Sequence, residues 1–197
     1  MNPLNPMNLF PAFLKLQGRR VVLVGGGRVA ASKLDALLHA GARVTVIAPA
    51  ILPEIARQPV TIHRRAFEDA DVDDAWWVVA AAPPEVNRAV RDAAESRRVF
   101  VNAVDDPRHA TAYLGGVVRR DDVTIAISTN GRAPALAALL REAIDALLPR
   151  DLARWLASSD EARRRWKSEG VPMEQRRPRL LHVLNHLYED REPQRES

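Results

Sequence analysis

Cysteine is absent from this chain of 197 residues, which excludes disulfides, thiolate metal sites and a cysteine nucleophile. Long apolar runs are also missing, because no stretch approaches the roughly 18 residues that a membrane-spanning helix needs. The first residues lack the basic and apolar segments of a secretory signal. These absences predict a cytoplasmic protein with no membrane partner.

Lysine is scarce, since it stands only at Lys15, Lys33 and Lys167, and arginine supplies the other basic side chains. The formal net charge is +4 and the sequence pI is about 10.1. Arginine binds carboxylates in a bidentate way that lysine cannot match. A codon bias toward arginine and a preference for polyanionic ligands explain this excess equally well.

The most informative stretch is an apolar strand that runs directly into a glycine turn and a helix, VVLVGGGRVA at residues 21–30. Gly25, Gly27 and Ala30 match the G-x-G-x-x-G/A fingerprint of dinucleotide-binding folds. In that fingerprint the small residues allow a tight turn, the approach of a pyrophosphate and close packing of the helix. A second strand at 43–47 completes a βαβ unit, so we predict a nucleotide site, with glycines that serve packing alone as the alternative.

The residues that usually identify the cofactor are missing. An Asp or Glu about 20 residues beyond the glycines commonly binds the adenosine ribose, but this chain carries Ala48-Pro49-Ala50 there. No arginine stands in that segment to bind a 2′-phosphate. The missing phosphate ligand favours NAD over NADP.

Alternating apolar strands and helices predict an α/β fold with a Rossmann-type parallel sheet. Strands are expected at 21–24, 43–47, 60–63, 76–81 and 99–103. A hairpin follows at 116–119 and 123–127, then a helix from about Pro134 and short helical runs at 152–157, 160–167 and 178–188. We therefore expect a dinucleotide-binding domain at 1–112, a hairpin and helix region at 113–149, and a small all-helical domain with a mobile tail at 150–197.

Candidate acid–base residues follow the fifth expected strand, at the sheet edge where ligands of open α/β folds bind. Asp105 or Asp106 can accept a proton from a substrate there, and His109 can assist or hold a metal. The alternative is an Asp-Asp-Pro turn that only hydrogen-bonds its own backbone. His182 and His186 are one helical turn apart, but they flank an apolar row, so we predict no metal site.

The arginine runs of the last expected helices favour a solvated surface. Arg163, Arg164 and Arg165 are consecutive, but neither a recognition helix nor an aromatic stacking motif accompanies them. Trp155 and Trp166 are expected as core anchors of the helical region. We predict no nucleic-acid partner.

Several segments, in order along the chain, resemble the precorrin-2 dehydrogenase and sirohydrochlorin ferrochelatase family, the N-terminal module of siroheme synthase. They are LKLQGRR at 14–20, the glycine turn, VIAP at 46–49, VNAVD at 101–105 and TIAISTNG at 124–131. The resemblance implies oxidation of precorrin-2 to sirohydrochlorin with hydride transfer to NAD⁺, and in several members the insertion of Fe²⁺. It also implies a homodimer that forms through the hairpin and helical region.

The resemblance also implies which residues form the site. The family's catalytic aspartate falls on Asp105. Its dinucleotide contacts fall on Gly25, Gly26, Gly27, Arg28, Val29, Pro49 and Ala50, and Ala82 in the loop after the fourth expected strand completes the set. The carboxylates of precorrin-2 give the arginine excess a partner, at Arg119, Arg120, Arg132 and Arg141.

The chain departs from the family pattern in two loops. Ala82-Pro83-Pro84 replaces the usual Thr-Asp-Asp, and the segment at 112–116 lacks the usual aromatic residue followed by proline. These differences keep open a second hypothesis, a non-catalytic carrier or sensor that binds a tetrapyrrole or a dinucleotide. Chelatase activity is a third, additive hypothesis that rests on the resemblance alone.

Overall fold

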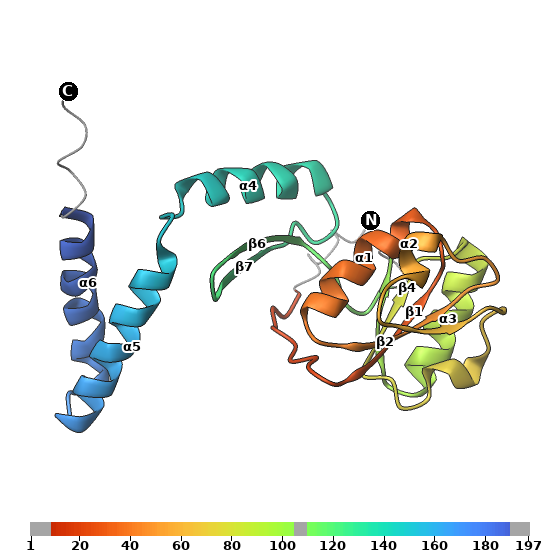
Figure 1. Cartoon of the computed structure of the whole chain (residues 1–197), viewed down its shortest axis with the longest axis horizontal. Helices are drawn as coiled ribbons and strands as arrows, with labels where there is room; N and C mark the ends of the chain where they lie inside the picture. The colour runs from red at the N-terminus through yellow and green to blue at the C-terminus, as the bar shows by residue number, and fades with distance from the viewer. Residues whose placement is uncertain (1–8, 105–109, 190–197) are drawn as a thin grey trace, which may run out of the picture. The chain divides into compact units, whose positions relative to one another are not determined.

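The computed structural model of the chain describes residues 9–104 and 110–189, with side chains up to residue 185 (Figure 1). Backbone contacts divide the chain into two compact units. The first is Met1–Leu114 with Asn130–Arg132, and the second is Gly115–Thr129 with Ala133–Ser197. None of the helices among the described residues combines the length and apolarity that crossing a bilayer requires.

The first unit is built on a five-stranded parallel sheet in the order β3-β2-β1-β4-β5. Its strands are β1 (Arg20–Val24), β2 (Arg43–Ile47), β3 (Thr61–His63), β4 (Trp77–Ala80) and β5 (Phe100–Ala103). The connections carry α1 (Arg28–His39), α2 (Pro53–Ala56), the short 3₁₀ helix η1 (Asp69–Val72) and α3 (Pro84–Ser96). The predicted α/β fold with a Rossmann-type sheet is confirmed.

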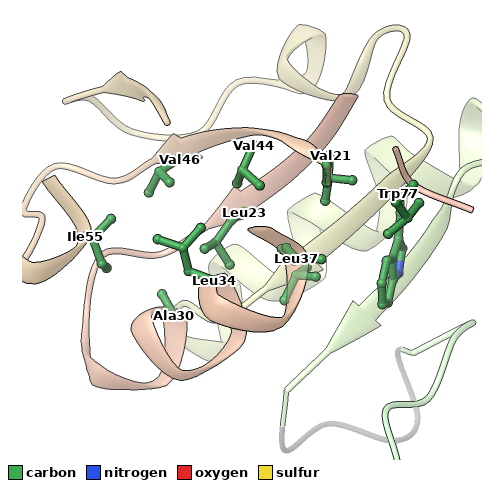
Figure 2. Packing of buried hydrophobic residues seen from close by; sticks show 12 residues of the cluster. Val21, Leu23, Ala30, Leu34, Leu37, Val44, Val46, Ile55 and Trp77 are labelled. Atoms are coloured by element: carbon green, nitrogen blue, oxygen red, sulfur yellow. The ribbon is translucent and has the colours of Figure 1, made fainter. Parts of the chain in front are cut away.

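Two apolar layers form because successive side chains of a strand point to opposite faces of the sheet. Val21 and Leu23 pack with Leu34 of α1 on one face, as Figure 2 shows. Val22 and Val24 pack on the other face, with a cluster that includes Val90 of α3. The sheet is therefore covered on both sides, which is why β1 reads as a continuous apolar run.

The second unit begins with an antiparallel hairpin of β6 (Gly116–Arg120) and β7 (Val123–Ile127), followed by α4 (Pro134–Leu147). Arg120 ties the hairpin to the end of this helix. Its guanidinium donates to the carbonyls of Leu148 at 2.7 Å and Asp145 at 3.0 Å, and to the Asp145 carboxylate at 2.7 Å. Arg120 thus satisfies carbonyl groups that the end of a helix leaves unpaired.

The helical runs at the end of the chain are longer than predicted. The structure has two helices, α5 (Leu152–Ser168) and α6 (Met173–Glu189), in place of three short ones. Ser159 does not interrupt α5, because its hydroxyl donates back to the Trp155 carbonyl at 2.7 Å. Pro178 lies inside α6 and does not begin it, so the prediction of a start at 178 is wrong. The predicted break between the helices is confirmed, with Gly170 at a φ of +67°.

Candidate dinucleotide site

The first glycine of the turn is required by both conformation and space. Gly25 has a φ of +130°, which side-chain-bearing residues rarely adopt, and a Cβ here would overlap the carbonyl oxygen of Ala81. Its N–H donates to the Ile47 carbonyl at 2.9 Å. Gly25 therefore joins the turn to the ends of both neighbouring strands, β2 and β4.

The second glycine brings the loop after β2 onto the turn. A Cβ on Gly26 would overlap the carbonyl oxygen of Ala50, and the Gly26 carbonyl accepts a hydrogen bond from Leu52 N at 2.9 Å. Pro49 and Ala50 are exposed beside this contact. The structure thus brings together the turn and the loop that the sequence analysis assigned to the dinucleotide.

The third glycine opens the start of α1 to solvent. Gly27 is the N-cap residue, no side chain caps the helix, and a Cβ at this position would meet no atom within 4 Å. Gly27, Arg28 and Val29 are all exposed. Helix N-termini with unpaired N–H groups attract phosphate oxygens. The space and the donors at this turn fit a pyrophosphate.

The loop after β4 lies against the same turn. Ala81 N donates to the Val24 carbonyl at 2.8 Å, which extends the sheet pairing beyond the last residue of β4. Ala82 N donates to the side chain of Asn87 at 3.0 Å. Ala82 is partly exposed. Asn87 was missed in the sequence analysis, although a polar residue on the apolar face of the following helix was a visible signal.

The predicted acid–base residues Asp105, Asp106 and His109 lie outside the described residues. Just before these residues, the Val104 N–H donates to the Ala80 carbonyl at 2.9 Å, which holds Val104 beside the end of β4. The chain after them returns to β5, where Thr111 N donates to the Val101 carbonyl at 2.9 Å. Val104 therefore lies at the carboxyl edge of the sheet, next to the loop after β4.

Two side chains reinforce the return to β5. The Thr111 hydroxyl accepts a hydrogen bond from Val101 N at 2.8 Å. The buried amide of Asn102 donates to the Ala112 carbonyl at 3.0 Å. Both contacts join residues about ten positions apart along the chain, which is why sequence patterning alone did not reveal them.

A bidentate ion pair orders the loop after β3. Arg65 donates to both carboxylate oxygens of Asp71, at 2.7 and 2.6 Å, although Asp71 is only 7% exposed. The hydrogen bond from Arg65 lowers the pKa of Asp71 against the opposing effect of burial, and Glu68 N adds a second donor at 2.8 Å. The hydrogen bonds from Arg65 and Glu68 N thus favour the ionised form of Asp71, which orders this loop.

The other charged candidates have different outcomes. Arg120 is engaged with α4, so the prediction that it binds substrate carboxylates is not supported. Arg141 pairs with the neighbouring Glu142 at 3.0 Å on the surface. Among the described residues, no three His, Asp or Glu side chains gather closely enough to hold a metal ion. The side chain of His186 lies outside the described part of the chain.

Comparison with known proteins decides the family. An NAD(P)-binding family model matches residues 12–116, and a model described as sirohaem biosynthesis protein central matches residues 120–147. Siroheme synthase 1 of Aeromonas salmonicida is 42% identical over 176 residues, and the siroheme synthase of Citrobacter koseri is 39% identical over 176 residues. This chain belongs to the siroheme synthase N-terminal module family. Its first unit is thus an NAD(P)-binding domain.

The aligned share differs between this chain and the siroheme synthases. Each alignment covers 87% of this chain but only 38% of the siroheme synthase. A solved structure described as "SirC, precorrin-2 dehydrogenase" covers 89% of both chains with a TM-score of 0.69 and 23% identity. That structure shares the fold over most of this chain.

Proposed function

We propose that this module is an NAD-dependent precorrin-2 dehydrogenase, which oxidises precorrin-2 to sirohydrochlorin in siroheme biosynthesis. The proposal rests on the geometry of the glycine turn. The turn is open to solvent at Gly27, and the loops after β2 and β4 contact it. The siroheme synthases supply the substrate class, because the chain matches them over 87% of its length.

The residues of the turn have separate roles in this proposal. The N–H groups of Gly27, Arg28 and Val29 bind the pyrophosphate at the start of α1. Pro49 and Ala50 line the adenosine side and Ala82 lines the nicotinamide side. NAD is the cofactor we propose, because the 48–50 segment offers no basic side chain for a 2′-phosphate.

Asp105 is the acid–base residue of the proposal. The oxidation removes a hydride and a proton from the macrocycle, and NAD⁺, when bound, accepts the hydride. A carboxylate at the carboxyl edge of the sheet accepts the proton. Asp105 follows Val104, whose backbone pairs with Ala80 beside the Ala82 loop.

Asp105→Asn tests this role, because the amide keeps the size of the side chain and cannot accept the proton. In an anaerobic assay with precorrin-2 and NAD⁺, the variant is expected to form NADH at least a hundredfold more slowly than the parent, with an unchanged melting temperature. The neighbouring Asp106→Asn is the matched control and is expected to retain most of the rate. If Asp105→Asn formed NADH at the rate of the parent, Asp105 would not be the acid–base residue.

The same assay separates the enzyme from the carrier hypothesis, which the altered loops motivate. A carrier or sensor binds precorrin-2 and NAD⁺ without forming NADH. Chelation is tested apart from this, with sirohydrochlorin and Fe²⁺ as substrates. A rate no faster than the spontaneous reaction would exclude that added activity.

We also propose a homodimer that forms through the hairpin and α4. The supporting observation is a row of leucines on α4 that its own unit leaves exposed, namely Leu136, Leu139, Leu140 and Leu147. Exposed apolar rows of this kind commonly mark contacts between subunits.

A further inference from the structure

The apolar face of α3 contains one polar side chain near the start of the helix. Val90, Ala93 and Ala94 are buried on this face, and Asn87 is buried with them at 3% exposure. Burying an amide costs free energy unless it is hydrogen-bonded. The hydrogen-bond partner of Asn87 therefore indicates why a polar amide, and not an apolar side chain, occupies this buried position.

Asn87 reaches back from α3 to the loop that precedes the helix. Its Oδ1 accepts a hydrogen bond from the Ala82 N–H at 3.0 Å. The direction is that of helical side chains in general, which point toward the N-terminus of the helix. Pro83 and Pro84 have no N–H, so the Ala82 N–H is the last backbone donor before Glu85.

The loop held by this hydrogen bond forms part of the candidate site. The carbonyl of Ala81 occupies the space that a side chain on Gly25 would need. On the other side of β4, Val104 N donates to the Ala80 carbonyl at 2.9 Å. The loop after β4 thus lies between the glycine turn and the strand that leads to Asp105.

We propose that Asn87 is a positioning residue for the dinucleotide, because it fixes the loop after β4 against the glycine turn through the Ala82 amide. This inference rests on the proposed function and assigns a role that lies one contact away from the cofactor. Ala82, Pro83 and Pro84 carry no polar side chain. The loop can therefore recognise a dinucleotide only through the position of its backbone and its small apolar surface.

The test compares two truncations of the same helix face in the full chain. Asn87→Ala is expected to raise the Kd for NADH by about three- to tenfold, the effect of one neutral hydrogen bond lost. The KM for NAD⁺ rises by the same factor, and the KM for precorrin-2 stays within about twofold. Val90→Ala is the matched control, since it removes buried packing one turn later and leaves the hydrogen bond between Asn87 and the Ala82 N–H in place. It lowers the melting temperature and leaves the Kd within about twofold.

Two results would overturn the inference. One is a parental Kd for NADH in Asn87→Ala, and the other is an equal loss of affinity in Val90→Ala, which would reflect general destabilisation. If Asn87→Ala is insoluble, Asn87→Ser replaces it, because the shorter side chain does not reach the Ala82 N–H. A parent protein that binds no NADH contradicts the proposed function itself, which distinguishes that failure from one confined to Asn87.

Discussion

The sheet of the first unit and the hairpin with α4 in the second differ in how completely each buries its own apolar side chains. In β1, the residues from Val21 to Val24 are all buried, and α1 and α3 belong to the clusters on opposite faces. In α4 only Ala137 is buried, while Leu139 is 63% exposed and Leu147 is 80% exposed. The central strand of the sheet is thus fully covered within its own unit, whereas α4 leaves a row of apolar side chains exposed.

The largest expected effect contrasts one leucine from each region. Leu34 of α1 is 1% exposed, so Leu34→Ala is expected to lower the free energy of unfolding by about 3 kcal/mol through lost contacts and a cavity. Leu139→Ala on α4 is expected to change it by less than about 0.5 kcal/mol in dilute protein. Urea denaturation of both variants checks the comparison, and equal losses would contradict it.

The Arg65–Asp71 pair gives the next largest effect within the first unit. Asp71→Asn removes the bidentate partner of the solvent-accessible Arg65 guanidinium, so we expect a loss of unfolding free energy at neutral pH that is smaller than the loss in Leu34→Ala. The folded state lowers the pKa of Asp71. The stabilisation by the ionised Asp71 is therefore fully present above the pKa of the unfolded state, about 3.9, and is lost as the pH falls through the lower pKa of the folded state.

Urea denaturation at several pH values checks this prediction. The difference between parent and Asp71→Asn should be full at pH 7 and should shrink below about pH 4. Asp69→Asn, on the exposed side of the same loop, is the control and should stay within about 0.5 kcal/mol of the parent. A difference that grows on acidification would contradict the assigned direction of the pKa shift.

The smallest expected effect concerns association through the second unit. Leu139→Asp places a carboxylate in the exposed leucine row and is expected to raise the dissociation constant of the proposed dimer at least tenfold, or about 1.4 kcal/mol. Leu181→Asp on α6 is the control, since Leu181 is similarly exposed but lies outside the row. Sedimentation equilibrium measures both. A dimer that tolerates Leu139→Asp as well as Leu181→Asp would place the interface elsewhere.

The fold of the first unit could be predicted because its signals are local. The apolar runs of β1, β2 and β4, and the small residues at Gly25, Gly27 and Ala30, stand at spacings that only a strand, a turn and a helix satisfy together. Their positions in the structure follow from those spacings.

The contacts that could not be predicted join a side chain to a distant backbone. Arg120 binds the end of α4, about 25 residues further along the chain, and its sequence neighbours do not indicate a carbonyl partner. Asn102 and Thr111 likewise hold the chain on both sides of the segment that contains Asp105. The single helix α5 was predicted as two runs, 152–157 and 160–167, although the Ser159 hydroxyl between them donates to the Trp155 carbonyl of the same helix.

An anaerobic single-turnover reaction tests the central claim most directly. Excess protein is mixed with precorrin-2 and NAD⁺, and absorbance spectra follow NADH and sirohydrochlorin together. The account predicts that the two products rise at one rate and in equal amounts. Bound precorrin-2 that stays reduced while NAD⁺ remains unchanged would contradict it.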